Sequence, residues 1–157
     1  MKRQDVLAIW NVLESLGNEQ TSVEFAYVVA KNQALIKDEY ESVKKSILPS
    51  KSYQKYEEAR LEIAKINASK NSTGQPNMAN GNIIIDPNNV EKIKGELEKL
   101  NKENEEAIKE RELQMKEAED FFEQEINIEF ETTLISNFPK TLTPNQMKYL
   151  IQFIKET

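Results

Sequence analysis

The sequence contains neither histidine nor cysteine among its 157 residues. Histidine is the commonest general base of enzymes, so its absence removes the Ser-His and Cys-His catalytic pairs. The absence of cysteine removes the thiol nucleophile, and zinc sites that need either residue are excluded as well. The four glycines stand singly, so no glycine-rich loop is present to hold a phosphate. These absences favour binding over catalysis, and the sequence indicates no cofactor.

Long hydrophobic runs are also missing. No stretch approaches the roughly 20 apolar residues that a helix needs to span a bilayer. Acidic residues stand among the apolar residues near the N-terminus, a pattern that a signal peptide does not have. Hydrophobic residues make up 38% and charged residues 31% of the chain, and the mean hydropathy is -0.68. We therefore expect a cytoplasmic protein that forms a single elongated, helix-rich domain over residues 1–157.

Apolar residues at helical spacing predict two helices in the N-terminal third. The first covers residues 5–16 and ends at Gly17-Asn18. The second is capped by Thr21 or Ser22, and Glu24 stands where it would complete a capping box with Thr21. The apolar face predicted for the second helix is Val23, Ala26, Tyr27, Ala30, Ala34, Tyr40, Val43 and Ile47.

Proline and glycine divide the middle of the chain. Pro49 lacks an N–H group and stops the second helix after Leu48, so residues 51–68 form a third helix. Asn80-Gly81 is typical of a two-residue hairpin turn. It predicts a short β-hairpin in which residues 75–79 pair with residues 82–86; the alternative is a disordered tip.

A helix predicted over residues 90–122 carries a nearly heptad seam. Asn104 and Arg111 interrupt it, either to fix the register or because the helix leaves its partner there. The seam is longer than the third helix can cover, so we expect it to bind a second copy of the chain or another helix. Its residues are Val90, Ile93, Leu97, Leu100, Asn104, Ala107, Arg111, Gln114, Ala118 and Phe121.

Beyond this helix the period of the apolar residues changes from helical to alternating. Residues 125–134 predict a half-buried strand, and its inward residues are Ile126, Ile128, Phe130 and Leu134. Thr143-Pro144 is typical of a helix start and predicts a terminal helix. The apolar residues expected on that helix are Met147, Leu150, Ile151 and Ile154.

The elements together predict a fold that is mainly α with a small β element. A long antiparallel helical hairpin carries a short β-hairpin or strand and a C-terminal helix.

Acidic residues are concentrated in residues 103–131, which hold twelve acids against three bases in a chain of net charge -6. One interpretation is a solvated helix supported by spaced pairs such as Glu105–Lys109. The other is a negative surface that steers the chain toward a basic protein partner. The residues proposed for that surface are Glu110, Glu117, Glu119 and Asp120.

One basic-aromatic group of residues could contact a nucleotide or another anion. It consists of Lys51, Tyr53, Lys55, Tyr56 and Arg60. The two tyrosines are three residues apart, so they could equally be packing residues.

A carboxylate site for a metal ion is a further hypothesis. Glu103 with Glu106 and Glu117 with Asp120 form spaced pairs. On one helix these pairs would stand about 21 Å apart, too far to share an ion. We therefore predict no metal ligands.

Four segments resemble a known group of proteins. They are residues 2–7 (KRQDVL), residues 21–32 (TSVEFAYVVAKN), residues 80–83 (NGNI) and residues 125–129 (EINIE). Their layout along the chain is similar to that of small, uncharacterised phage and prophage proteins of low-GC bacteria. The resemblance implies a viral origin, and hence the cytoplasm of a host cell, but no active site.

These observations predict a non-enzymatic binding protein. With a viral origin, we expect a stoichiometric antagonist of a host-defence component that occupies a groove on a protein or sequesters a nucleotide signal. The alternative is a virion assembly, scaffolding or chaperone role through helical oligomers. The third hypothesis is a nucleotide hydrolase with a carboxylate-bound metal. A nucleic-acid or membrane partner is not expected.

Overall fold

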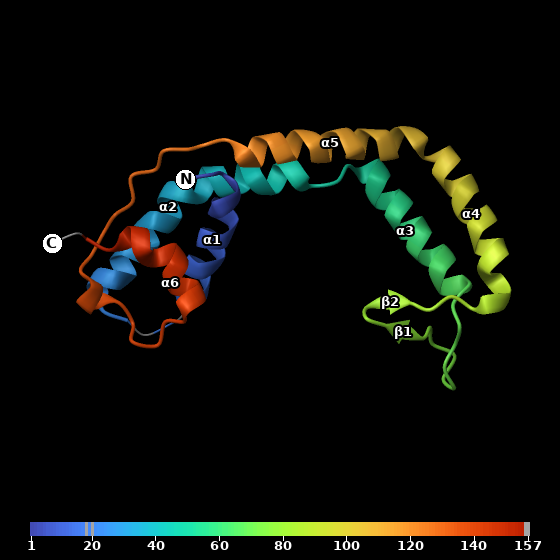
Figure 1. Cartoon of the computed structure of the whole chain (residues 1–157), viewed down its shortest axis with the longest axis horizontal. Helices are drawn as coiled ribbons and strands as arrows, with labels where there is room; N and C mark the ends of the chain where they lie inside the picture. The colour runs from blue at the N-terminus through green and yellow to red at the C-terminus, as the bar shows by residue number, and fades with distance from the viewer. Residues whose placement is uncertain (18, 20, 156–157) are drawn as a thin grey trace. The chain divides into compact units, whose positions relative to one another are not determined.

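The computed structural model describes residues 1–17, 19 and 21–155, and it confirms a mainly α fold with a small β element (Figure 1). The chain divides into two compact units. Unit 1 comprises Met1–Leu48 and the residues from Met115 onward, and unit 2 comprises Pro49–Gln114. The long helix α5 (Glu105–Glu123) contributes residues to both. No described helix is both long and apolar enough to cross a membrane.

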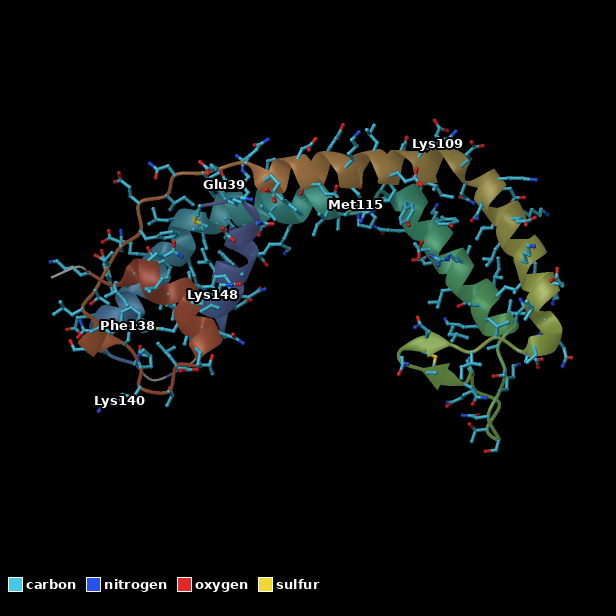
Figure 2. The ribbon with its side chains drawn as sticks, viewed as in Figure 1. Glu39, Lys109, Met115, Phe138, Lys140 and Lys148 are labelled. Carbon is cyan, nitrogen blue, oxygen red and sulfur yellow. The ribbon has the colours of Figure 1, made fainter. Side chains whose placement is uncertain are left out.

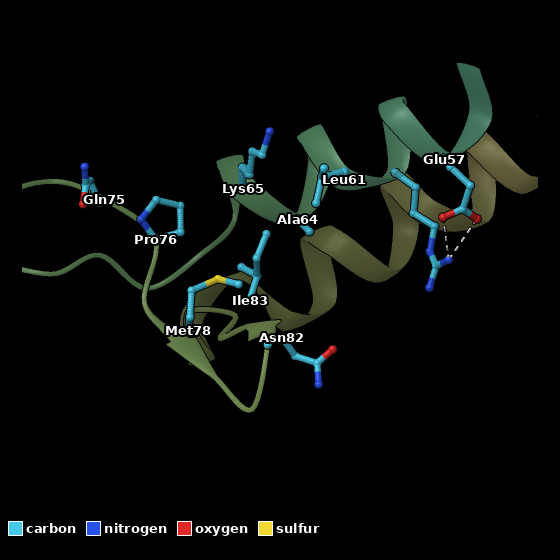
Figure 3. Close-up of a pocket in the computed structure, with 11 residues that line it drawn as sticks. Glu57, Leu61, Ala64, Lys65, Gln75, Pro76, Met78, Asn82 and Ile83 are labelled. Atoms are coloured by element: carbon cyan, nitrogen blue, oxygen red, sulfur yellow. Dashed lines mark hydrogen bonds and ion pairs between the residues drawn. The ribbon is translucent and has the colours of Figure 1, made fainter. Parts of the chain in front are cut away.

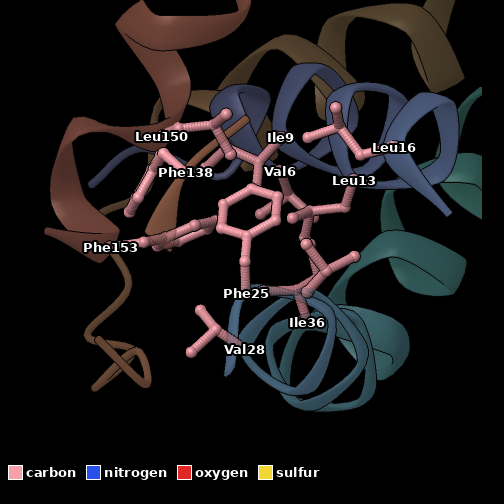
Figure 4. Close-up of a cluster of buried hydrophobic side chains, with 11 residues drawn as sticks. Val6, Ile9, Leu13, Leu16, Phe25, Val28, Ile36, Phe138, Leu150 and Phe153 are labelled. Atoms are coloured by element: carbon pink, nitrogen blue, oxygen red, sulfur yellow. The ribbon is translucent and has the colours of Figure 1, made fainter. Parts of the chain in front are cut away.

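Unit 1 is organised around α1 (Gln4–Leu16), which packs against α2 (Val23–Ile47) and α6 (Pro144–Leu150). The bounds of α1 agree with the prediction, although Asn18 lies outside the described residues. In Figure 4 the Phe25 ring reaches from α2 into the middle of the core, where its centroid is 4.7 Å from that of Phe138. The core cluster contains Val6, Ile9, Leu13, Leu16, Phe25, Val28, Val29, Ile36, Phe138, Leu150 and Phe153.

The face that α2 buries agrees with the predicted one only in its C-terminal half, where Val43 is buried and Tyr40 packs against the core. Val23, expected inward, is 82% exposed, and Tyr27 is also exposed. The two faces differ in the apolar surface area that they can bury, because the predicted face is rich in alanine and the opposite face carries larger apolar side chains. The larger buried area gives the greater stabilisation. The cap is Ser22, whose hydroxyl accepts from Phe25 N, so the capping box expected at Thr21 is absent. The buried residues of α2 are Phe25, Val28, Val29, Asn32, Ile36 and Val43.

Residues 125–134 run extended but do not form a strand of a sheet, which corrects the prediction. They make one isolated bridge between Lys2 and Glu125 and another between Thr133 and Ile154. The alternation is nevertheless real over most of the segment, because three of its apolar residues pack against the core. These are Ile126, Ile128 and Phe130. Leu134, expected inward, is 47% exposed, because the chain turns there into a 3₁₀ turn over residues 135–137.

The N-terminus of the chain is held against α2 and the end of α5 by Arg3. Its Nε donates at 2.9 Å to Oε2 of Glu39, which is labelled in Figure 2, and its Nη1 donates to the side-chain oxygen of Gln124. The guanidinium carbon also lies 4.2 Å from the centroid of the Phe121 ring. One planar cation therefore joins three segments of unit 1.

The start of the terminal helix is as predicted. Thr143 caps α6, and Gln146 completes a capping box. The helix ends at Leu150 and continues as a 3₁₀ turn, so the inward residue of that turn is Phe153. Ile151, expected on the apolar face, is 65% exposed because the tighter 3₁₀ turn changes the periodicity.

Unit 2 is built on an antiparallel pair of helices, α3 (Lys51–Ile66) and α4 (Val90–Glu103), with a β-hairpin between them. Strands β1 (Met78–Ala79) and β2 (Asn82–Ile83) are shorter than predicted but pair in the predicted antiparallel sense around Asn80-Gly81. Both turn residues have positive φ, 50° at Asn80 and 80° at Gly81, as a type I′ turn requires.

The helix predicted over residues 90–122 is broken at Asn104, where φ is −119° and ψ is 21°. The Asn104 side chain donates to the Leu100 carbonyl at 2.9 Å, which gives one of the last carbonyl groups of α4 a hydrogen-bond donor. α5 then begins as a separate helix at Glu105.

On α4 the predicted seam residue Val90 is 50% exposed, which corrects the prediction there. On α5 all the predicted seam residues are buried or half-buried, although Ile108, Met115 and Phe122 are half-buried as well. These seam residues are Ala107, Arg111, Gln114, Ala118 and Phe121.

Candidate functional site

An open groove of about 740 Å³ lies in unit 2 between α3 and the β-hairpin (Figure 3). One wall is a single face of α3, because its lining residues recur at helical spacing. The other wall is the hairpin together with the two residues that lead into it. The helix contributes Glu57, Arg60, Leu61, Ala64 and Lys65, and the hairpin side contributes Gln75, Pro76, Met78, Gly81, Asn82 and Ile83.

The floor of the groove is apolar and accessible. Met78 and Ile83 are cross-strand partners in the hairpin, and in Figure 3 Ile83 points toward Ala64 with Met78 beside it. Leu61 is 48% exposed and Met78 is 57% exposed, so the chain's own contacts leave about half of each side chain accessible to a ligand. An exposed cluster of apolar side chains with polar neighbours is characteristic of a binding surface.

The charges beside the floor are paired with one another. Nη1 of Arg60 donates to both carboxylate oxygens of Glu57, at 3.1 and 3.3 Å, and Nζ of Lys65 lies 2.7 Å from Oε1 of Glu62. These are exposed pairs within α3, and such pairs contribute about 0–1 kcal/mol each. A ligand could therefore replace either partner at little cost.

The hairpin is anchored to the end of α3 through Asn67, which is fully buried. Its Nδ2 donates to Oε2 of Glu96 on α4 at 2.8 Å, and its carbonyl accepts from Asp86 N at 3.0 Å. Ser69 continues the connection, because its N–H donates to the Ile84 carbonyl and its carbonyl accepts from Asn77 N, both at 2.8 Å. The groove is therefore held open by backbone hydrogen bonds at its base.

The basic-aromatic group is only partly at this groove. Arg60 lines it, whereas Lys51 and Lys55 are exposed elsewhere on α3. The tyrosine rings lie 5.5 Å apart and pack within unit 2, with Tyr56 buried and its hydroxyl donating to Oδ1 of Asn101 at 2.8 Å. Their faces do not form a stacking surface for a nucleotide.

The Tyr53 phenol is occupied as well. Its hydroxyl donates to Oε1 of Glu57 at 3.0 Å, and the Arg111 guanidinium lies 5.7 Å from its ring centroid. Burial, and then the hydrogen bond to Glu57, raise the pKa of the phenol above its ordinary value. Tyr53 does not itself line the groove, but its hydrogen bond positions Glu57, which does.

The proposed acidic residues are all exposed on α5, but in different units. Glu110 belongs to unit 2, whereas Glu117, Glu119 and Asp120 belong to unit 1. Glu117 and Asp120 are one helical turn apart and share a face. Over residues 1–17, 19 and 21–155, no group of three or more acidic side chains is placed to hold a metal ion.

A second hollow, of about 630 Å³, lies at the break between α4 and α5 and is lined mostly by charged residues. Its one apolar lining residue is Leu113. Lys109 stands 2.6 Å from Glu105 there (Figure 2), and this ion pair lowers the pKa of Glu105 and raises that of Lys109. Glu105–Lys109 is one of the spaced pairs expected for a solvated helix.

The Asn80-Gly81 turn was predicted from the sequence, whereas the groove beside it was not. A recognisable pattern was present in Leu61, which is 48% exposed and stands five residues after the buried Tyr56, on a different face of α3. A helix with apolar residues on a second face needs a second partner.

No family model, curated protein or solved structure matches this chain. Function therefore has to follow from the chain's own residues.

Proposed function

We propose that the protein acts by stoichiometric binding of another protein, and that the groove between α3 and the hairpin is its binding surface. The observation that carries the proposal is the accessible apolar floor formed by Leu61, Met78 and Ile83 beside self-paired charges. Protein interfaces commonly combine an apolar centre with a polar rim. A partner that inserts an apolar side chain into such a groove gains energy from burial, and the rim excludes water around it.

The resemblance in layout to phage and prophage proteins is our ground for proposing a host-defence component as the partner, which the protein would antagonise by occupying it. Sequestering a nucleotide has less support, because the rings of Tyr53 and Tyr56 pack against each other and against their neighbours. A scaffold built through the α5 seam also has less support, because the chain itself already buries or half-buries the seam residues. Self-association stays a prediction that light scattering over a range of concentrations would test.

The acidic surface takes a second role within this proposal. Glu117 and Asp120 are exposed and contribute to a negative field that would accelerate encounter with a basic partner. Exposed charges act mainly on the association rate, whereas the apolar floor of the groove would act on dissociation.

Capture from a host lysate tests the groove when it is done with matched variants. Leu61→Arg places a charge on the floor, and Leu113→Arg makes the same change at an exposed leucine outside the groove. We expect the wild type and Leu113→Arg to retain the same protein partner and Leu61→Arg to lose it. Calorimetry with that partner should then give a fixed molar ratio. Equal capture by all three proteins would rule out the groove, and turnover of the partner or of a cosubstrate would rule out stoichiometric binding.

A further inference from the structure

The turn of the hairpin exposes an asparagine beside a glycine. Asn80 and Gly81 are both exposed, and no hydrogen bond to the Asn80 side-chain amide or the Gly81 N–H is found among the described residues. Outside residues 80–82, no described heavy atom lies within 4 Å of the position that a Cβ would take at Gly81, so the space beside this glycine is open. Because no such hydrogen bond holds the Asn80 carboxamide, its side chain can turn toward the Gly81 nitrogen.

We propose that Asn80 is a site of spontaneous deamidation, with water as the only co-reactant. The Gly81 backbone nitrogen attacks Cγ of Asn80, so that an N–C bond forms and the Cγ–Nδ2 bond breaks. Nδ2 leaves as ammonia and carries away the proton that Gly81 N loses. The product is a five-membered succinimide that joins positions 80 and 81.

Water then opens the succinimide at either of its two carbonyl carbons. Opening at the main-chain carbonyl leaves an isoaspartate, in which the chain runs through Cβ and Cγ. Opening at Cγ leaves an ordinary aspartate. Each route adds a negative charge at position 80, and no oxidation or reduction takes place.

Gly81 distinguishes this asparagine from the others. A following side chain hinders attack by its own nitrogen, and Asn80 is the one asparagine in the sequence that precedes a glycine. Asn71-Ser72 is the nearest comparison, since Asn71 is exposed and serine is small. The Asn71 side-chain oxygen, however, accepts from Thr73 N, Thr73 Oγ1 and Gln75 N at 2.7–3.0 Å, and these three hydrogen bonds restrain its rotation.

The isoaspartate form would alter the hairpin. The type I′ turn has two residues and a defined register, Met78 opposite Ile83 and Ala79 opposite Asn82. An additional main-chain carbon in this turn does not fit that geometry, so the pairing that orients Met78 and Ile83 in the groove would weaken. The deamidation itself does not depend on the groove having a binding role.

Peptide mass spectrometry of the intact, folded chain tests the proposal. After incubation in a mildly alkaline buffer, we expect the peptide with Asn80 to gain one mass unit and to contain more isoaspartate than aspartate. In a mildly acidic buffer the gain should be slower, because attack requires loss of the Gly81 N–H proton. Asn71 and Asn82 are internal controls and should change at least several-fold more slowly.

Asn80→Gln retains the amide but disfavours the five-membered ring, so it should abolish the change at that position. Conversion of Asn80 no faster than that of Asn71 would overturn the proposal, as would aspartate without isoaspartate. A folded chain that converts far more slowly than the same chain in denaturant would also overturn it, because the turn would then protect the residue.

Discussion

The side chain of Asn32 pairs with the backbone of Glu131 through both ends of its amide. Nδ2 donates to the Glu131 carbonyl at 3.0 Å, and Oδ1 accepts from the Glu131 N–H at 2.9 Å. Asn32 is fully buried on α2, so a helix side chain here provides the two hydrogen bonds that a neighbouring strand would provide. This explains how residues 125–134 stay extended without a sheet.

Asn32→Ala should therefore loosen the extended segment. The Glu131 backbone groups lose their partners, and each such loss costs about 1–3 kcal/mol where the group stays away from water. Since Glu131 is itself exposed, water can replace part of the loss, and we expect a fall of about 1–3 kcal/mol in the free energy of unfolding. Urea denaturation measures it. Asn11→Ala, at an exposed position of α1, is the control, and an equal effect of both substitutions would contradict the pairing.

The alternation in the extended segment gives a second prediction. Ile128→Asp puts a charge against the core of unit 1 and should lower the melting temperature clearly, because a buried unpaired charge is costly. Glu129→Lys, at an exposed position, should have little effect. Leu134→Asp is the sharper control, since alternation alone predicts damage there whereas the exposure of Leu134 predicts almost none. Damage from Leu134→Asp as large as that from Ile128→Asp would contradict the observed turn.

The hydrogen bond between Tyr56 and Asn101 is the third test. It joins α3 to α4 in a unit whose helix pair buries few side chains, with Tyr56 the one buried residue of α3. Tyr56→Phe should cost about 0.5–1.5 kcal/mol and leave Asn101 without this partner. We expect faster amide hydrogen exchange along α3 and unchanged exchange along α1. Uniform acceleration in both helices would show that the bond stabilises the whole chain equally.

The Tyr53 phenol predicts a dependence on alkaline pH. Its pKa is raised in the folded chain by burial and by the Glu57 carboxylate, and it returns to about 10 on unfolding. Because the folded pKa is the higher one, this contribution to stability is full below about pH 10 and is lost as the pH rises through the folded pKa.

Phenolate absorbance should therefore show one late-titrating tyrosine in the wild type that is missing in Tyr53→Phe. Glu57→Gln should move that step earlier without restoring the ordinary value, since burial is the larger cause. If Tyr53→Phe kept a late rise in phenolate absorbance of equal size, that rise would belong to another tyrosine.

The acidic surface gives the fifth prediction. Glu117→Lys combined with Asp120→Lys should change the free energy of unfolding by less than about 1 kcal/mol, because both residues are exposed. Once a partner is identified, the double variant should associate more slowly at low salt and with a weaker dependence on salt, since such charges are screened over about 8–10 Å. If the wild type and the double variant associated with the partner at equal rates, the acidic residues would contribute to solubility and not to binding.

Features governed by neighbouring residues could be predicted from the sequence. The bounds of α1, the end of α2 before Pro49, the cap at Thr143 and the turn at Asn80-Gly81 each depend on a few adjacent residues whose backbone preferences are strong. The seam of α5 also followed from periodicity, because its spacing identifies one face whatever covers it.

The tertiary structure alone decided which competing surface is buried and where the chain bends. α2 has apolar residues on two faces, and only packing against α1 selects the face of Phe25 over that of Tyr27. The break at Asn104 and the pairing of Asn32 with Glu131 both use a side-chain amide to satisfy a distant or terminal backbone group. The groove likewise requires α3 and the hairpin to be brought together through Asn67. Spacing along the chain does not encode such contacts, because their free energy depends on which groups meet after the chain has folded.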